Sequence, residues 1–581
     1  MPLRAQARLP LLDTMRVAAS ARTGALAAAM RSVTIIGRDD IERTAARTLG
    51  DVLAPLTGVD IRARSPASAD VALRGASTEG VIVLVDGIRV SDQQSGHFDL
   101  DLSVPLNDVD HIEILRGTSS ALHGADAVGG VINVVTRGAR PATSASLRAS
   151  GGTFATSAIA FDASSQNLSG AIDHTGSSGS RPGTDYSATQ ARASLSSAAF
   201  NGIVRVDGGL GVRHFGAADF YGAYPAYEDT RSATASAAYD IGLGTDWSLS
   251  ARADTRRHGD LFTLVRTNPA LYQNQHTSWQ SGLEVVTHGQ PSGVLSVASG
   301  ADIHALTLTS ARLGDHDLRR NALYSEVTLG EAGHASVDLG ARGDWSSADK
   351  AFFSPSIAGM LPLGHEVSLR ASTSRGFREP TWTELYYKDP ANIGDSTLKA
   401  ETFWSGEMGV HAATGARTSV DAVYFWREAD DLIDWTKPAS APDSVPWHTK
   451  NVERASYRGV EAEASLRELF AADWTLRASA LSFTSDAAAG FRGKYALSPI
   501  TSSIGVSTTF HVGSARLGVD ATRSRRAGEG MQTIGNMRLV APMGAVQLTA
   551  DLFNLGDASY LDVSGKPIAG RALLVGAAWR L

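Results

Sequence analysis

The sequence predicts a transmembrane β-barrel of about 22 antiparallel strands, with an N-terminal α+β domain inside the lumen. From about residue 144 to the end, apolar and polar residues alternate with a period of two, which places one set of side chains on each face of a strand. No run approaches the roughly 18 consecutive apolar residues that a membrane-spanning helix needs. The first 140 residues instead combine a helical pattern with short, glycine-punctuated strands.

The alternation is clearest in the predicted barrel wall, residues 141–581. Val337, Leu339 and Trp345 share one strand face, whereas Asp338 and Arg342 share the other. A soluble sandwich would also have an apolar face, but here the polar face carries arginines in strand after strand, which a water-filled lumen explains better. About 440 residues, at about 20 per strand and turn, give about 22 strands, a size at which barrels contain a plug.

The predicted N-terminal domain, residues 31–140, starts with a short strand at 33–36. Asp39 and Asp40 suit the N-terminus of a following helix, because acidic side chains complement the helix dipole. An apolar stripe continues the helical pattern over 41–56, and Pro55 and Gly58 mark its end before the next strand at 59–61. We therefore expect a small α+β unit of about 110 residues.

Residues 71–137 are the most distinctive stretch of the chain, with VALRGASTEGVIVLVDGIRV at 71–90 followed by VDHIEILRGTSSALHGADAVGGVINVVTRG at 109–138. Each glycine predicts a tight turn, a bulge or a close backbone approach. Within a closed lumen a charge must find a partner, so Arg74 and Arg116 are expected to pair with Glu113 or Asp86. The alternative is a solvated loop face.

This stretch resembles the plug domain of TonB-dependent outer-membrane receptors, through LRG at 73–75, VLVDGIR at 83–89 and GGVIN at 129–133. Later segments are similar to wall strands of that family, among them SRGFREP at 374–380, YRGVE at 457–461 and LFNL at 552–555. Thr118 and His123 depart from the usual family residues without changing the assignment. The positions that the resemblance assigns to plug structure are Arg74, Gly75, Asp86, Gly87, Glu113, Arg116, Gly117, Gly129 and Gly130.

The resemblance implies a monomeric active transporter in the outer membrane of a Gram-negative bacterium. Its cargo would be a scarce, bulky nutrient, a ferric siderophore or cobalamin, and its energy would come from TonB with ExbB and ExbD. Leu581 stands where the family ends on an aromatic residue read by the barrel-assembly machinery, which puts assembly efficiency in question. The alternatives are a passive porin-like or adhesion barrel that retains a plug, and a soluble multi-strand enzyme.

Residues 1–30 are rich in Ala and Arg without a sustained period, and predict a mobile tail. The start MPLRAQARLPLLDTM lacks the roughly 7 to 15 residue apolar core of a signal peptide, so we expect a mis-assigned start or a removed signal. One tail segment resembles a TonB box, which would pair with TonB by strand addition; a plain disordered tail is the alternative. The segment is Asp13, Thr14, Met15, Arg16, Val17, Ala18 and Ala19.

Two plug loops and one wall loop are candidate ligand contacts. The loops at 64–68 and 91–97 follow strands and are rich in hydrogen-bonding residues, and the corresponding family loops touch the substrate. The wall loop RHFGAADFYGAYPAYEDTR at 213–231 offers rigid aromatic contact area, with a membrane-interface girdle as the alternative. The predicted contact residues are Arg64, Ser65, Ser68, Ser91, Gln93, Gln94, His97, Phe220, Tyr221, Tyr224 and Tyr227.

The same wall loop leaves calcium binding open. Asp219, Glu228 and Asp229 could supply oxygen ligands to a hard cation. The segment resembles part of the barrel in the cobalamin branch of the family, but residues 176–187, where that branch carries calcium-binding aspartates, contain only Asp185. Both calcium and cobalamin therefore remain alternatives, and we predict no dedicated metal site or cofactor.

Composition excludes other function classes. The chain has no cysteine, so it has no disulfide framework or thiolate metal site, and its formal charge of -7 gives no basic footprint for nucleic acid. His365 and Glu366 open like a zinc-protease motif, but Leu369 stands where the second ligand is required. Neither a nucleophile elbow nor a phosphate-binding loop occurs in the sequence. We therefore expect no enzyme activity.

Overall fold

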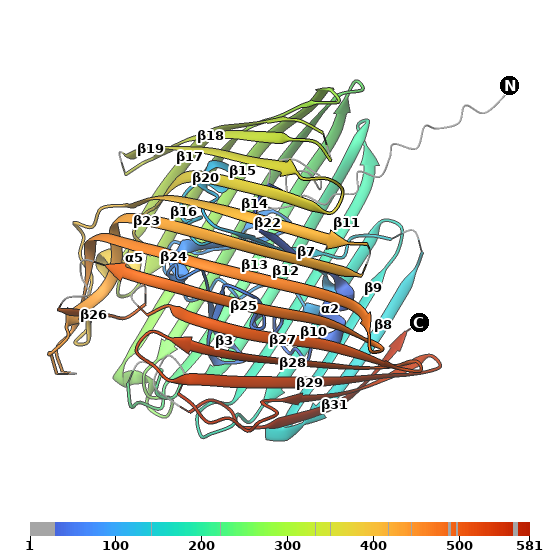
Figure 1. The fold of residues 1–581 in the computed structure, drawn as a ribbon. Helices are drawn as coiled ribbons and strands as arrows, with labels where there is room; N and C mark the ends of the chain where they lie inside the picture. The colour runs from blue at the N-terminus through green and yellow to red at the C-terminus, as the bar shows by residue number, and fades with distance from the viewer. Residues whose placement is uncertain are drawn as a thin grey trace.

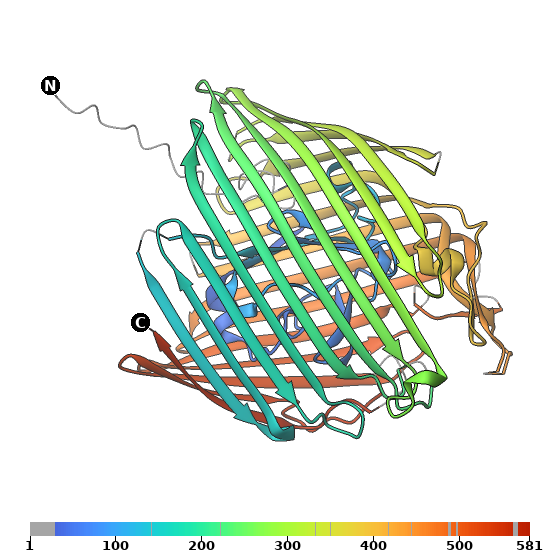
Figure 2. The same cartoon turned by 180° about the vertical axis from the view of Figure 1, so that it is seen from behind.

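The computed structural model describes residues 30–140, 142–220, 222–331, 333–348, 350–415, 417–442, 444–485, 490–495, 498–561 and 567–580. A closed antiparallel barrel surrounds the N-terminal domain, which lies inside it in both views (Figures 1 and 2). Within these ranges, no helix is long and apolar enough to cross a membrane. The predicted fold class is confirmed.

The barrel wall consists of 22 long strands, with the short β21 (Asn392–Ile393) and β26 (Phe491–Gly493) paired onto it. The ring closes where β31 pairs with β8, with Leu574 opposite Gly152. The wall strands are β8 (Ser144–Gly152), β9 (Thr156–Ser164), β10 (Leu168–Ser177), β11 (Tyr186–Ala199), β12 (Gly202–Gly216), β13 (Tyr227–Leu243), β14 (Trp247–Thr263), β15 (Gln273–Ser292), β16 (Leu295–Ser310), β17 (His316–Leu329), β18 (Ser336–Ser346), β19 (Lys350–Pro362), β20 (Val367–Arg378), β22 (Glu401–Thr414), β23 (Thr418–Pro438), β24 (Trp447–Leu469), β25 (Ala472–Ser485), β27 (Ile500–Val512), β28 (Ala515–Arg526), β29 (Met531–Met543), β30 (Val546–Phe553) and β31 (Ala572–Arg580).

The two rims of the barrel differ. One, the short-turn rim, joins strands through turns such as 200–201, 293–294, 470–471 and 544–545. The other, the long-loop rim, carries connections such as 217–226, 379–400 and 554–571, and includes α5 (Trp382–Tyr386) and the 3-10 turn η4 (Pro269–Leu271). The 3-10 turn η3 (Thr153–Ala155) joins β8 to β9. The unequal connections therefore distinguish the two ends of the barrel.

The plug, which we define as residues 31–140, is built on a five-stranded sheet in the order β1 (Val33–Ile36), β6 (Val109–Arg116), β7 (Gly130–Thr136), β4 (Val81–Val85) and β5 (Ile88–Arg89). A separate hairpin pairs β2 (Val59–Ser65) with β3 (Ser68–Leu73). The remaining elements are α2 (Arg38–Arg43), α3 (Leu49–Leu53), α4 (Ser120–His123), η1 (Thr78–Gly80) and η2 (Leu106–Asp108). Ile112, Ile114 and Ile132 are fully buried in the main plug core.

The helix expected after Asp39 and Asp40 is divided in two. Thr44 leaves the helical conformation after α2, and Thr48 starts α3 by accepting a hydrogen bond from the backbone N–H of Asp51. The Asp51 carboxylate accepts in return from the backbone N–H of Thr48. This reciprocal capping box favours a new helix start over a continuous helix.

Candidate ligand-binding and plug-contact site

A buried ion-pair cluster joins the middle of the plug to the wall. Arg74 follows β3, and its guanidinium donates to Glu461 of β24 at 2.7 Å and to Glu407 of β22 at 2.8 Å. The ring of Phe425 packs against the guanidinium, with its centroid 4.3 Å from the Arg74 Cζ. Buried charges persist only where opposite charges and hydrogen bonds compensate their desolvation, as they do here. The cluster ties plug and wall together.

The expected pairing of Arg74 and Arg116 with Glu113 or Asp86 is therefore wrong. Arg116 donates to the carbonyl of Thr57 at 2.9 Å and to the hydroxyl of Thr34 at 2.8 Å. The predicted partners are all plug residues, whereas the wall supplies most of the countercharges. The actual partners are Asn133 and His111 for Glu113, and Arg192 of β11 together with Thr136 for Asp86.

The plug glycines agree with the expected close approaches at two positions. Gly75 has a φ of +73°, and a Cβ there would meet the side chain of Leu481 at 2.8 Å. Gly130 has a φ of +146°, and a Cβ would lie 2.1 Å from the carbonyl oxygen of Leu115 on the paired strand. A side chain cannot be accommodated at either position without moving the wall or the sheet.

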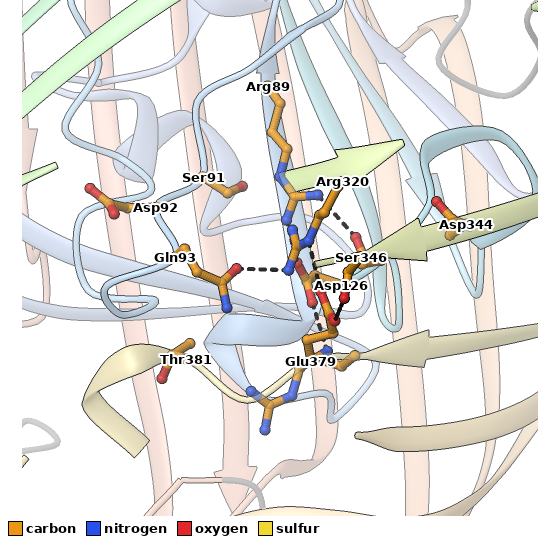
Figure 3. Close-up of polar contacts among 12 residues, drawn as sticks. Arg89, Ser91, Asp92, Gln93, Asp126, Arg320, Asp344, Ser346, Glu379 and Thr381 are labelled. Atoms are coloured by element: carbon orange, nitrogen blue, oxygen red, sulfur yellow. Dashed lines mark hydrogen bonds and ion pairs between the residues drawn. The ribbon is translucent and has the colours of Figure 1, made fainter. Parts of the chain in front are cut away.

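The loop at 91–94 is held against the long-loop rim (Figure 3). Arg320 of β17 donates to the side-chain oxygen of Gln93 at 2.8 Å and to Glu379 at 2.7 Å, and it also pairs with Asp126 of the plug at 3.3 Å. Gln93 in turn donates to the carbonyl of Pro380 at 2.9 Å. One wall arginine thus connects two plug segments to the loop that follows β20.

Three of the predicted ligand-contact residues, Ser91, Gln93 and Gln94, are buried in this contact. The Ser91 hydroxyl accepts from the backbone N–H of Val83, and the backbone carbonyl of Gln94 accepts from the N–H of Thr383. The side chains of Ser91 and Gln93 thus serve the plug and the wall, whereas the buried side-chain oxygen of Gln94 has no hydrogen-bond partner among the described residues. The segment at 380–383 is hydrogen-bonded to Gln93 and Gln94 and lies against them.

The hairpin loop at 64–68 and His97 form a second junction. Asp70 accepts from Arg64 at 3.2 Å and contacts the Nδ1 of His97 at 2.9 Å. The His97 ring meets the ring of Tyr495 edge-on, with centroids 5.6 Å apart. Ser65, Ser68 and His97 are half-buried and therefore more accessible than the 91–94 segment, whereas the Arg64 side chain is only 5% exposed.

The His97 imidazole is charged over most of the physiological range. Burial disfavours its charged form, but the carboxylate of Asp70 outweighs this effect and raises the pKa of His97 to about 9. A pKa raised above the ordinary value of about 6.5 adds stability that is complete below about pH 6.5 and is lost as the pH rises through about 9.

We expect the thermal unfolding midpoint of the wild-type protein to fall between pH 6.5 and 9.5 by more than that of His97→Gln, because only the wild type loses the ion pair with Asp70. Over this pH range the wild type should lose on the order of 2 kcal/mol more unfolding free energy than His97→Gln, a value already reduced for the partial solvent access of the ring. The control is His174→Gln, at an exposed histidine that contacts Thr189. Identical pH profiles for wild type and His97→Gln would contradict the assignment.

The aromatic wall loop is divided between interior and surface. Phe220 is buried in a cluster with Phe215 and Ala67, whereas Tyr224 is 48% exposed. The guanidinium of Arg266 lies over the ring of Tyr227, with its Cζ 4.0 Å from the centroid. Tyr221 lies outside the described residues. Tyr224 is therefore the aromatic residue of this loop best placed for a ligand arriving from outside.

The three carboxylates considered for calcium do not converge. Asp219 pairs with Arg181 at 3.1 Å, Asp229 contacts His214, and Glu228 is buried on the opposite strand face from Asp229. In the part of the chain that the structure describes, no group of three His, Cys, Asp or Glu residues is arranged to hold a metal ion. The candidate TonB box at 13–19 and the last residue, Leu581, fall outside that part.

Comparison with known proteins identifies two domains. The model of the TonB-dependent receptor plug domain matches residues 25–131, and the model of the TonB-dependent receptor-like β-barrel matches residues 136–564. A vitamin B12 transporter BtuB of Vibrio vulnificus is 24% identical over 490 residues, which cover 78% of this chain and 75% of the relative. A BtuB of Vibrio cholerae is 40% identical over 127 residues, which cover 22% of this chain and 21% of the relative.

Solved structures share the fold at lower identity. A variant of the ferric enterobactin receptor PfeA of Pseudomonas aeruginosa superposes with a TM-score of 0.80 at 15% identity, and the match covers 95% of this chain and 99% of that one. The siderophore receptor PirA of Acinetobacter baumannii gives a TM-score of 0.80 at 13% identity, with 95% and 99% covered.

Proposed function

This chain belongs to the TonB-dependent receptor family, and from that premise we propose that it actively imports a ferric siderophore or cobalamin across the outer membrane, driven by TonB. The wall would lie in the outer membrane of a Gram-negative bacterium, where the barrel-assembly machinery inserts it as a monomer. ExbB and ExbD would couple TonB to the proton gradient of the inner membrane. Enzyme activity is not part of the proposal.

The observation that carries the proposal is a plug bound to the wall at several levels. Arg74 binds Glu407 and Glu461 in the middle of the plug, and Arg320 binds Gln93 and Asp126 nearer the long loops. Passive diffusion of a bulky ligand requires an open lumen, but here those contacts must be rearranged first. Rearranging them costs free energy, which an external energy source would supply.

The two proposed substrate classes are taken from the names of the related proteins. The sequence relatives are vitamin B12 transporters and the structural neighbours are siderophore receptors. Fold alone does not choose between these ligands. At the external mouth, the partly exposed His97 and the exposed ring of Tyr224 offer positive charge and aromatic surface to either class.

A binding screen of the detergent-purified protein tests the substrate. Intrinsic tryptophan fluorescence would be titrated with cobalamin and with a panel of ferric siderophores. We expect sub-micromolar affinity for one class, and a weakening of about tenfold in Tyr224→Ala, because an aromatic anchor contributes on the order of 1 to 2 kcal/mol to a contact of this kind. Absence of tight binding to every compound in both classes would contradict the proposed substrates.

A further inference from the structure

The lipid-facing side of the wall carries two belts of tryptophan. Near the long-loop rim, Trp279 of β15, Trp345 of β18 and Trp404 of β22 are 48%, 46% and 50% exposed. Trp426 of β23 lies on the strand next to Trp404, on the same outer face. Near the short-turn rim lie Trp247, Trp474 and Trp579, at the ends of β14, β25 and β31. Tryptophan concentrates where lipid headgroups meet the hydrocarbon, so the two belts mark the two membrane interfaces.

Three tryptophans of the outer belt stand directly opposite an arginine on the neighbouring strand, whereas the fourth, Trp345, stands opposite Asn321 and Ala351. Arg257 is the register partner of Trp279, Arg375 that of Trp404, and Arg458 that of Trp426. Residues directly opposite in an antiparallel pair have their side chains on the same face of the sheet. The three arginines therefore face the lipid at the level of the outer interface.

Neighbouring residues confirm that these arginines point outward. Arg256, next to Arg257, faces inward and pairs with Asp92 of the plug at 3.2 Å. Ser374, next to Arg375, donates to the plug carbonyl of Thr118 at 2.9 Å. Tyr457, next to Arg458, is fully buried on the lumen side. Since side chains alternate between the two faces of a strand, each arginine must lie on the outer face.

The outer arginines are poorly compensated by protein charge. Among the described residues, Arg257 and Arg375 form no ion pair and their side chains make no hydrogen bond. Arg458 donates one long hydrogen bond to Glu428, at 3.4 Å, and both side chains are at least half exposed. Farther from the long loops on the same strand faces lie the apolar side chains of Ala253, Leu369 and Val460.

The inner belt has no such pairing. The register partners of its tryptophans are Gly289 and Leu243 for Trp247, Leu466 and Thr508 for Trp474, and Val546 and Leu147 for Trp579. The inner belt thus lacks the arginine–tryptophan pairing of the outer belt, and this difference points to a specific headgroup chemistry on the outer side.

We propose that the three Arg–Trp pairs, Arg257–Trp279, Arg375–Trp404 and Arg458–Trp426, bind the phosphate groups of phosphorylated glycolipids in the outer leaflet. An arginine in the middle of the membrane costs roughly 2 to 4 kcal/mol, but this cost falls to about 0 to 1 near the interface. The planar guanidinium matches phosphate with two parallel hydrogen bonds, while the indole packs on sugar and acyl surface. The inference depends on the membrane placement of the wall and is independent of the imported ligand.

The test compares lipid binding to the full-length protein, measured by native mass spectrometry from detergent micelles. The probes are a bis-phosphorylated lipid A and the same lipid without its phosphates. The variant is Arg257→Gln/Arg375→Gln/Arg458→Gln. The matched control is Arg417→Gln/Arg467→Gln/Arg516→Gln, which removes the same charge at the short-turn rim, where Arg417 pairs with Glu468 in an exposed position.

We expect the wild type and the control to bind the phosphorylated lipid at least about tenfold more tightly than the dephosphorylated lipid, because arginine–phosphate hydrogen bonds are strong. The triple variant should lose this preference while retaining the β-sheet content of the wild type by circular dichroism. Equal binding of both lipids by the wild type, or an unchanged preference in the triple variant, would overturn the proposal. Complete displacement of the lipid by millimolar inorganic phosphate would also overturn it, because the site would then be one for free anions.

Because a triple substitution can impair assembly, the three single glutamine variants provide a second measurement. Each should lower the preference by a part of the triple effect. The lysine triple variant keeps the charge but loses the two-pronged geometry, and it should fall between the wild type and the glutamine triple variant. Single variants that all retain the full wild-type preference would contradict the assignment.

Discussion

Cells that express a variant lacking residues 13–19 are expected to bind the ligand at their surface with unchanged affinity but to accumulate no more of it than cells without TonB. The segment is proposed to pair with TonB as an added strand, in which backbone hydrogen bonds provide most of the affinity. Removing it disconnects the energy source but leaves the external loops intact. Uptake and surface binding of radiolabelled cobalamin or ferric siderophore would be measured in parallel.

A finer variant tests the strand geometry itself. In a paired strand, alternate residues point their N–H groups toward the partner, so one of Val17 and Ala18 must donate whatever the register. Proline has no N–H to donate. The variant Val17→Pro/Ala18→Pro should therefore behave like the deletion, whereas Val17→Ala/Ala18→Ser should import normally. Loss of surface binding in the proline variant, or normal import by it, would refute the assignment of this segment.

Replacing Arg74 by leucine is expected to weaken the docking of the plug by about 3 to 5 kcal/mol, because it leaves the carboxylates of Glu407 and Glu461 buried without a countercharge. The consequence should be an ion leak, measured as conductance of the purified protein in planar bilayers. Arg266→Leu is the control. Its partner is Asp185 in an exposed loop, where an ion pair contributes less than about 1 kcal/mol.

A compensating variant separates charge from packing. In Arg74→Leu/Glu407→Leu/Glu461→Leu the buried carboxylates are removed together with the arginine, and replacing a whole buried ion cluster by apolar residues is often nearly neutral. The triple variant should therefore leak less than Arg74→Leu. A leak that is absent in Arg74→Leu, or that grows in the triple variant, would show that these charges do not hold the plug.

The architecture could be predicted from the sequence because it depends on local pattern. Alternation with a period of two is visible wherever a strand separates lipid from lumen, as at Val337 and Leu339, and chain length then limits the number of strands. The break between α2 and α3 was also visible in principle, because Thr48 and Asp51 have the spacing of a capping box. The continuous apolar stripe over 41–56 concealed it.

The partners of the plug charges could not be predicted in this way. Arg74 and Glu461 are 387 positions apart, and the pairing arises only when the wall closes around the plug. Composition was equally ambiguous for the 91–94 loop. Serine and glutamine suit an adaptable ligand contact, but they equally suit hydrogen bonds to backbone groups, which is the role of Gln93 against Pro380. No motif in the sequence marks Arg320, although the SRGFREP segment contains its partner Glu379.

This barrel is proposed to move its ligand only when energy reaches the plug. Ligand accumulation by intact cells should be measured before and after a protonophore collapses the proton gradient, with surface binding followed in the same samples. We expect accumulation to stop while surface binding persists. Accumulation that continues at the full rate without a gradient would contradict it and would identify a passive pore that has retained its plug.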